Sequence, residues 1–205
     1  AKPYDIYMKT LYTLLQDRLD GADGGELLWY LEITKDLAKF QERAVWHSIQ
    51  KIRDYGGCFV ADVVGLGKSY VGAAIIKHFE RTERARPLII CPKSLEEMWV
   101  RYNEIYNLNA QVLPMSMLLE DPGRGVNIFD DVRYRNRNFV LVDESHNFRH
   151  YTNQRYNILQ SFLAAGHKAC LLTATPRSRG CWDIYNQIKL FHQDDITDLP
   201  ITPPN

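Results

Sequence analysis

The sequence lacks the features that mark membrane, secreted and disulfide-stabilised proteins. No apolar run approaches the roughly 18 residues needed to span a bilayer, and the opening AKPYDIYMKT is too polar for a signal peptide. Only 4 cysteines occur, and none forms a CxxC pair. We therefore expect an intracellular protein with reduced thiols, no structural zinc site and no membrane partner.

An excess of charge of one sign is also missing. Lysine and arginine together number 25, as do aspartate and glutamate, so net charge argues neither for nor against a polyanionic partner. The length of 205 residues suits one domain, and a hydrophobic fraction of 45% excludes a largely disordered chain. Because the chain starts without methionine and stops at ITPPN, we expect it to be part of a longer protein.

Short apolar runs alternate with longer amphipathic stretches along most of the chain. Such continuous runs predict strands covered on both faces. Their alternation with helices predicts an α/β fold with a mainly parallel central sheet and helices on both faces. The expected strands are residues 58–61, 88–91, 111–115, 139–142 and 169–173. The expected helices are residues 36–54, 70–82, 95–106, 155–164 and 181–191.

Three segments lie outside this alternation. Residues 1–35 carry mixed helical patterning interrupted by DGADGG, which predicts an N-terminal helical extension containing a loop. Residues 120–138 predict a polar surface loop, whose basic RYRNRN stretch favours a solvated face over a nucleic-acid site. The main domain is therefore expected at residues 36–192, with a linker over residues 193–205.

A glycine-rich turn, GLGKS, stands between a predicted strand and a predicted helix. Gly65 and Gly67 lack the Cβ that would keep a phosphate away from the backbone N–H groups, and the helix N-terminus adds its positive dipole end. Lys68 would then hold the β- and γ-phosphates, and the Ser69 hydroxyl would bind Mg²⁺. Asp62 replaces the first glycine of the strict GxxxxGK[ST] pattern. The alternative is a glycine turn with a surface lysine.

An acidic pair follows the apolar run FVLV, where that predicted strand ends. Ligands of open α/β sheets bind at the carboxyl ends of the strands, so Asp143 and Glu144 are expected at the binding edge. One carboxylate can hold Mg²⁺ while its neighbour orients or deprotonates the attacking water. We assign Asp143 to the metal and Glu144 to the water. Alone, such a pair would more often be a solvated loop end.

A third polar strand end is the run TATP, which follows the apolar ACLL. The hydroxyls of Thr173 and Thr175 could bond the acidic loop and so report whether the γ-phosphate is present. The alternative is a pair of β-branched residues finishing a strand before a proline turn. Without the glycine-rich turn and the acidic pair, we would favour that alternative.

Five segments occur in the order seen in superfamily 2 helicases. They are FQERAVW (40–46), ADVVGLGKS (61–69), LIICPKSLEEMW (88–99), LVDESH (141–146) and LLTATPRS (171–178). Over roughly residues 36–192 the chain most resembles the Swi/Snf-type branch, whose phosphate loop reads ADxxGLGKT and also lacks the first Walker glycine. DESH in place of DEAH, and Ser69 in place of threonine, are mild departures that keep the functional group.

The resemblance implies a RecA-like lobe that binds ATP and Mg²⁺. The nucleotide-binding residues would be Gln41, Val64, Gly65, Leu66, Gly67, Lys68 and Ser69. The catalytic residues would be Lys68, Asp143 and Glu144, and Ser69 and Asp143 would hold the metal. Gln41 would read the adenine through its amide, or it could be an ordinary polar residue on an amphipathic helix.

The resemblance also implies a nucleic-acid partner, with duplex DNA favoured. His146 and Thr173 or Thr175 would couple the nucleotide state to the nucleic-acid site. That site would include Pro92, Lys93 and Ser94 on the same sheet edge, and Ser116 as a weaker phosphate contact. Lys93 could equally be an ordinary surface residue at a helix start.

The leading hypothesis is the first motor lobe of an ATP-dependent DNA translocase. In this superfamily a second RecA-like lobe supplies the arginines that stabilise the transition state, so we expect the chain alone to bind ATP weakly and to hydrolyse it barely. An unwinding helicase, an RNA helicase and a restriction-type motor subunit stay open. So does a nucleotide-responsive binding module without catalysis of its own, although the intact Lys68, Ser69, Asp143 and Glu144 argue against a degenerate lobe.

Overall fold

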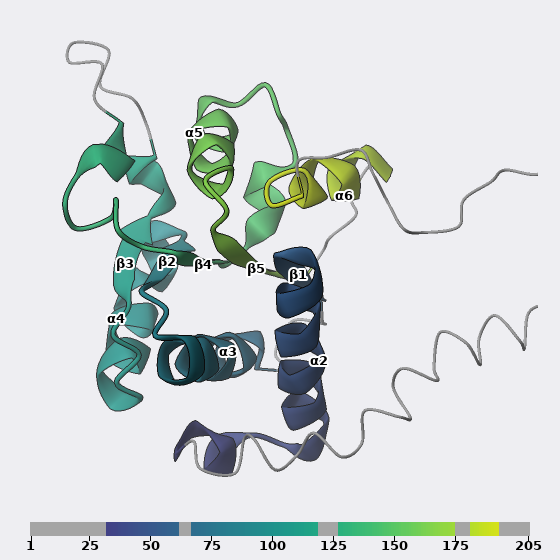
Figure 1. The fold of residues 1–205 in the computed structure, drawn as a ribbon, viewed down its shortest axis with the longest axis vertical. Helices are drawn as coiled ribbons and strands as arrows, with labels where there is room; N and C mark the ends of the chain where they lie inside the picture. The colour runs from purple at the N-terminus through teal and green to yellow at the C-terminus, as the bar shows by residue number, and fades with distance from the viewer. Residues whose placement is uncertain (1–31, 62–66, 119–126, 175–180, 193–205) are drawn as a thin grey trace, which may run out of the picture.

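A sheet of five parallel strands forms the centre of the described structure (Figure 1). The computed structural model describes residues 32–61, 67–118, 127–174 and 181–192. The strands are β1 (Gly57–Ala61), β2 (Pro87–Cys91), β3 (Gln111–Pro114), β4 (Phe139–Val142) and β5 (Lys168–Thr173), in the order β1-β5-β4-β2-β3. Because all neighbours are parallel, the carboxyl ends of all these strands meet at one edge. The predicted parallel sheet is confirmed.

Helices cover both faces of this sheet, as predicted. They are α2 (Lys39–Tyr55), α3 (Lys68–Glu83), α4 (Glu96–Ile105), α5 (Gln154–Leu163) and α6 (Cys181–Ile188). In Figure 1, α2, α3 and α4 lie below the sheet, and α5 and α6 lie above it. Alternate strand residues serve the two layers, so Leu141 packs in the cluster that contains α3, and Val142 packs in the cluster that contains α5.

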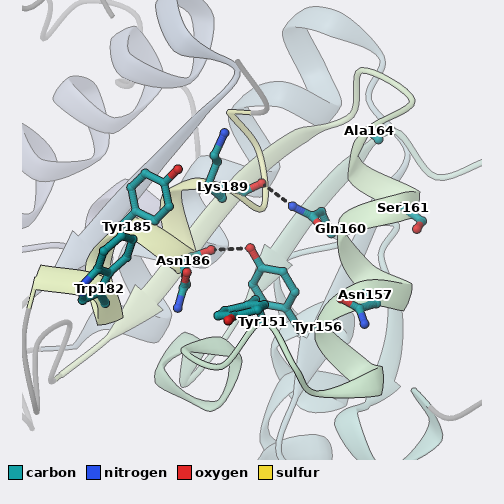
Figure 2. A pocket seen from close by; sticks show the side chains of 10 residues that line it. All are labelled: Tyr151, Tyr156, Asn157, Gln160, Ser161, Ala164, Trp182, Tyr185, Asn186 and Lys189. Carbon is teal, nitrogen blue, oxygen red and sulfur yellow. Dashed lines mark hydrogen bonds between the residues drawn. The ribbon is translucent and has the colours of Figure 1, made fainter. Parts of the chain in front are cut away.

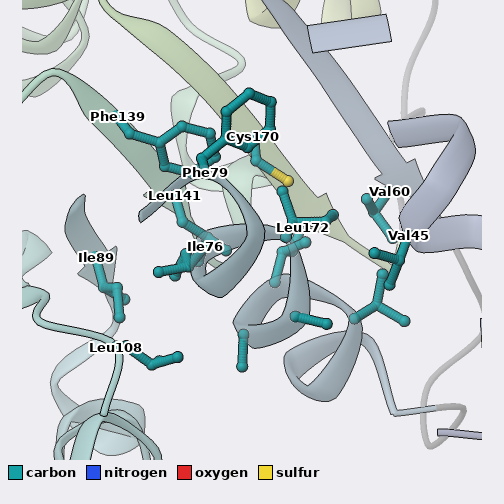
Figure 3. Close-up of a cluster of buried hydrophobic side chains, with 14 of the residues drawn as sticks. Val45, Val60, Ile76, Phe79, Ile89, Leu108, Phe139, Leu141, Cys170 and Leu172 are labelled. Carbon is teal, nitrogen blue, oxygen red and sulfur yellow. The ribbon is translucent and has the colours of Figure 1, made fainter. Parts of the chain in front are cut away.

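The larger apolar cluster lies between the sheet and the α2–α3–α4 layer. Figure 3 shows Val45 and Phe79 there beside the strand residues. The Phe79 ring stacks on Phe139 with the centroids 4.9 Å apart, and Trp99 of α4 is fully buried in the same cluster. Burying each such side chain contributes roughly 1.5–3 kcal/mol. This packing fixes the strands whose carboxyl ends carry the candidate site.

Both ends of α2 are set by specific local contacts. The side-chain Oε1 of Gln41 accepts the Ala38 backbone N–H at 2.7 Å, which caps the first turn. At the other end Gly56 adopts a left-handed conformation with φ 76°, and its N–H donates to the Ile52 carbonyl at 3.0 Å. The helix was expected from residue 36, but residues 32–36 form a separate 3-10 turn, η2 (Glu32–Asp36).

The prediction of a surface loop over residues 120–138 is wrong for the part that the structure describes. Residues 127–138 include the 3-10 turn η5 (Ile128–Asp130), and Phe129 and Tyr134 are buried in the cluster beneath α5. The Phe129 ring stacks on Phe162 of α5 at 3.9 Å between centroids. Aromatic side chains within a polar stretch therefore anchor it to the core.

The basic stretch of this segment is partly structural. Arg133 pairs with Asp131 at the surface, with Nη2 2.7 Å from Oδ2. Arg137 is half-buried and donates to the backbone carbonyls of Pro87 and Asn109, at 3.3 and 3.1 Å. The expected solvated face holds for Arg133, whereas Arg137 ties this segment to the start of β2.

The predicted N-terminal extension and C-terminal linker lie outside the described residues, apart from η2. The domain boundaries therefore stay predictions. Among the helices that the structure describes, none combines the length and the apolar character required to cross a membrane. Cys58, Cys91 and Cys170 are buried free thiols, and the first and last of these lie across β1 and β5 with their sulfurs 3.9 Å apart.

Candidate nucleotide site

After β1, the next residue that the structure describes is Gly67, which directly precedes α3. Gly67 has a left-handed backbone with φ 77°, and a Cβ at this position would overlap the side-chain amide nitrogen of Gln41. Gln41 is buried and lies on α2, so it reaches across to the end of the glycine-rich turn. Gln41 and Gly67, two nucleotide-binding candidates from separate segments of the sequence, therefore lie side by side. The backbone requirement and the close approach both explain a glycine here.

Lys68 and Ser69 form the first residues of α3 and are half-buried. The helix has 16 residues, and its first turn contains no acidic side chain. The backbone N–H groups at the start of the helix and the helix dipole therefore favour an anion at this end, without competition from a carboxylate in the first turn. The three other candidates of the turn, Val64, Gly65 and Leu66, lie outside the described residues.

Asp143 lies one residue beyond the end of β4 and is only 4% exposed. Its Oδ2 accepts the indole N–H of Trp99 at 2.8 Å, and its Oδ1 accepts the Glu144 backbone N–H at 2.9 Å. Burial raises the pKa of this carboxyl, these two hydrogen bonds oppose that rise, and the nearby Glu144 charge adds to it. The Lys68 ammonium, as a smaller effect, lowers the same pKa.

A buried carboxylate of this kind suits a cation. A carboxylate offers about four acceptor positions, so two hydrogen bonds leave capacity for a metal ion. The Asp143 carboxylate and the Ser69 hydroxyl are hard oxygen donors, the type that Mg²⁺ prefers, and Mg²⁺ commonly takes only one or two carboxylates plus substrate phosphates. The residues present therefore fit Mg²⁺ carried by a nucleotide.

Glu144 adopts an unusual backbone conformation for a non-glycine residue, with φ 50° and ψ 48°. Such a conformation persists only where the surroundings enforce it, and it is concentrated at functional sites. The Glu144 Oε2 lies 3.0 Å from Nδ1 of His146, although the contact does not have hydrogen-bond geometry. Both side chains are about one-third exposed or less, which leaves Glu144 accessible to a water molecule.

The acidic loop continues into the 3-10 turn η6 (Ser145–Phe148), which is bound to α6. The Ser145 hydroxyl donates to Oε1 of Gln187 at 2.9 Å, and Gln187 donates from Nε2 to the Asp183 carbonyl at 2.8 Å. Both Ser145 and Gln187 are fully buried. The serine of DESH therefore makes a specific contact that an alanine at this position could not make.

Thr173 ends β5 and is fully buried. It pairs with Ala61 of β1, and Leu171, two residues earlier, pairs with Val142 of β4. Thr173 therefore lies at the same strand-end level as the acidic loop and as Ala61, the last residue of β1. The neighbouring candidate Thr175 lies outside the described residues.

The residues predicted to contact nucleic acid follow β2 and β3, at the carboxyl edge of the sheet. Pro92 and Lys93 follow β2, and Ser116 follows β3 in the 3-10 turn η4 (Met115–Met117). The Lys93 side chain is 73% exposed and contacts the Glu96 carboxylate. Ser94 and Ser116 are exposed. The structure brings these residues to the expected edge and leaves both interpretations of Lys93 open.

A hollow among the described residues lies elsewhere, between α5 and α6. Its volume is about 610 Å³, and Tyr151, Trp182, Tyr185 and Lys189 are among its lining residues (Figure 2). None of the nucleotide candidates lines it. Residues 62–66 lie outside the described residues, so a surface hollow is a poor guide to the site at the strand ends.

The sequence analysis did not identify Trp99 and Gln187 as functional. Trp99 lies in the LIICPKSLEEMW segment, where a tryptophan is readily explained as a core residue. Its indole N–H, which usually has a hydrogen-bond partner when buried, was the one indication of a further role. Gln187 is a polar residue that a helical pattern alone would not assign to the buried side of α6. Both are recognised only from their hydrogen bonds to the acidic loop.

The chain is similar in sequence to known helicase and RNA polymerase-associated proteins. Over 162 residues the chain is 31% identical to the DNA annealing helicase and endonuclease ZRANB3 of Mus musculus, covering 69% of this chain and 15% of that protein. It is 26% identical over 164 residues to the RNA polymerase-associated protein RapA of Photobacterium profundum, covering 68% of this chain and 17% of that one. The matches therefore span only 15% and 17% of these relatives' lengths. No family model matches.

A solved structure shares the fold. The SWI2/SNF2 ATPase core of Sulfolobus solfataricus in complex with dsDNA matches with a TM-score of 0.59 and 17% sequence identity, over 75% of this chain and 35% of that chain. At this identity the likeness establishes the fold alone. It confirms the predicted RecA-like architecture for the strands and helices described above.

Proposed function

Because this chain belongs to the Swi/Snf-type branch of the superfamily 2 helicases and translocases, we propose that it binds ATP with Mg²⁺ and acts as the first motor lobe on duplex DNA. Hydrolysis would be coupled to movement along DNA or to its remodelling. A second RecA-like lobe would complete the catalytic site. The observation that carries the proposal is the placement of two segments: α3 begins at Lys68 beside Gln41, and Asp143 directly follows β4 at the carboxyl edge of the parallel sheet.

Each residue of this edge has a distinct task in the proposal. Lys68 and the N–H groups at the start of α3 bind the phosphates, while Gln41, beside Gly67, contacts the adenine. Ser69 and Asp143 would hold Mg²⁺, which would neutralise charge on the β- and γ-phosphates. Glu144 would orient or deprotonate the attacking water, and His146, beside Glu144, would couple the nucleotide state to the nucleic-acid site.

Nucleotide binding by the chain tests the proposal directly. We expect wild type to bind a fluorescent ATP analogue more tightly with Mg²⁺ than with EDTA, and Lys68→Ala to lose at least about tenfold of that affinity because it removes a phosphate contact. The matched control is Lys51→Ala, which removes an exposed lysine of α2. Equal affinities for wild type and Lys68→Ala would contradict the proposal.

The nucleic-acid track is the second element to test. Duplex DNA is favoured because the structural neighbour that shares the fold is an ATPase core in complex with dsDNA. We expect duplex DNA to stimulate ATP hydrolysis by the full-length protein more than single-stranded DNA or RNA does. Stimulation by RNA alone would support an RNA helicase instead. Binding of ATP without hydrolysis under every condition would support a nucleotide-responsive binding module.

A further inference from the structure

The indole N–H of Trp99 makes a single, buried hydrogen bond to the carboxylate of Asp143. The distance from Nε1 to Oδ2 is 2.8 Å, and Trp99 is 0% exposed. Tryptophan has one polar atom, so its entire hydrogen-bonding capacity is directed at this carboxylate. A hydrogen bond to an ionised acceptor is roughly twice as strong as one between neutral groups.

This contact limits how the Asp143 carboxylate can rotate. The Glu144 backbone N–H holds Oδ1 at 2.9 Å while Trp99 holds Oδ2, so both oxygens of the planar group have a fixed donor. Rotation of the carboxylate would break both bonds and leave the fully buried indole N–H of Trp99 without an acceptor. The remaining lone pairs of the Asp143 carboxylate oxygens therefore point in a fixed direction.

Trp99 is itself fixed by its packing against α3. A Cβ at Gly72 of α3 would lie 3.4 Å from Cη2 of Trp99, and the ring of Tyr102 packs edge-on at 5.9 Å between centroids. Since α3 begins at Lys68, one side chain connects the helix that carries the phosphate-binding end with the strand that carries the acid.

We propose that Trp99 is a positioning residue for the metal ion. It aligns the Asp143 carboxylate so that one lone pair faces the cation shared with Ser69 and the phosphates. This role rests on the proposed nucleotide site. It predicts a specific defect, because the loss of the indole N–H would weaken the contribution of Mg²⁺ to nucleotide affinity while leaving the contacts of the nucleotide itself in place.

The chain offers a matched control for a purely structural role. Trp46 on α2 is half-buried, and its Nε1 is buried without a hydrogen-bond partner among the described residues. Trp99→Phe and Trp46→Phe therefore remove similar indole groups from the same apolar layer. Only the first substitution also removes a donor to Asp143.

The experiment measures the affinity of the chain for a fluorescent ATP analogue, with Mg²⁺ and with EDTA. We expect the Mg²⁺-dependent gain to fall about 10- to 100-fold in Trp99→Phe, with the affinity in EDTA unchanged. Trp46→Phe should keep both values. An undiminished gain in Trp99→Phe would overturn the inference. Absence of any Mg²⁺-dependent gain in wild type would instead overturn the proposed nucleotide site.

A second measurement needs no substitution at Trp99, in case Trp99→Phe does not fold. In the wild-type chain the four indole ¹⁵N–H signals can be followed by NMR. Single substitutions of Trp29, Trp46 and Trp182 by Phe assign three of them, and the remaining signal is that of Trp99. We expect the Trp99 signal to shift when Mg²⁺ is added to the nucleotide complex, and the Trp46 signal to stay in place. A Trp99 signal that does not respond to Mg²⁺ would overturn the inference.

Discussion

Gly67 and Gly56 both have a left-handed backbone with nearly the same φ, 77° and 76°, but their surroundings differ. A Cβ at Gly67 would displace the Gln41 amide, whereas a Cβ at Gly56 meets nothing within 4 Å. Substituting each glycine by alanine therefore distinguishes two effects. Gly56→Ala reports the free-energy cost of a left-handed alanine, and Gly67→Ala adds the cost of displacing Gln41.

We expect Gly56→Ala to lower the free energy of unfolding by about 1–2 kcal/mol, the cost of a left-handed alanine. Gly67→Ala should cost a further 1–3 kcal/mol, roughly the cost of overpacking, and should also weaken ATP binding. Denaturant unfolding and nucleotide titration would measure the two effects. Equal behaviour of the two variants would show that the contact between Gln41 and Gly67 is unimportant.

Ser145 provides a second test at the level of single residues. Ser145→Ala restores the alanine of the DEAH pattern, but it removes the hydroxyl that donates to the buried Gln187. We expect the free energy of unfolding to fall by about 1–3 kcal/mol, since a buried acceptor loses its donor. Ser48→Ala is the control, because that hydroxyl donates to the Ala44 carbonyl within the same helix. A loss no larger than that of the control would contradict this account.

At the scale of elements, α2, α3 and β5 are joined by a charged cluster at the edge of the sheet opposite the site. Arg53 of α2 bonds Glu83 of α3 at 3.1 Å, and Lys168 of β5 contacts the same carboxylate. Arg53 also donates to Nε2 of His78 at 3.2 Å. An arginine can only donate, so His78 must be neutral to accept this bond.

His78 therefore makes the stability of this helix pair dependent on pH. Burial, aided by the Arg53 charge and opposed by Glu83, lowers the pKa of His78 from 6.5 to about 4. Between these values the unfolded chain binds a proton that the folded chain does not. The free energy of unfolding should therefore fall by up to about 3 kcal/mol as pH drops from 6.5 towards 4.

The measurement is denaturant unfolding at several pH values. His78→Gln keeps a hydrogen-bond acceptor for Arg53 but cannot titrate, so the fall in stability over this pH interval should shrink. A slope that is unchanged in His78→Gln would assign the acid sensitivity to other groups.

At the scale of the whole molecule, we expect this chain alone to bind ATP but to turn it over slowly. Arginines that stabilise the transition state raise rates by roughly 10³- to 10⁵-fold in related phosphoryl-transfer systems, and we propose that they come from the second lobe. A DNA-stimulated rate of about one per second or faster from this chain alone would contradict that dependence. In the protein with both lobes, Glu144→Gln should abolish turnover and preserve ATP binding.

Much of the architecture could be predicted because the strands are buried on both faces. The expected strand at residues 139–142 coincides with β4, since a continuous apolar run has few other solutions in a parallel sheet. The loop at residues 120–138 was misjudged because two aromatic anchors, Phe129 and Tyr134, interrupt a polar stretch. Whether such rings are buried depends on α5, which lies far along the sequence.

The parallel sheet also made the location of the candidate site predictable, but not its side-chain contacts. Parallel strands align their carboxyl ends, so Lys68 and Asp143 could be expected at one edge from the pattern alone. The hydrogen bonds of Trp99 and Gln187 could not be foreseen, because each depends on the rotation of a helix about its axis and on a side-chain rotamer. A linear pattern specifies neither.

The strand order has a mechanical consequence. The residues proposed to bind the nucleotide follow β1, β5 and β4, which are contiguous, whereas those proposed to contact nucleic acid follow β2 and β3, which form the remaining side of the sheet. The two groups meet where β4 pairs with β2, at an inter-strand spacing of roughly 4.8 Å, with Asp143 after one strand and Pro92 after the other. In the proposed motor, a force on the loop after β2 would therefore have only one neighbouring strand to displace before it reached the carboxylate proposed to hold Mg²⁺.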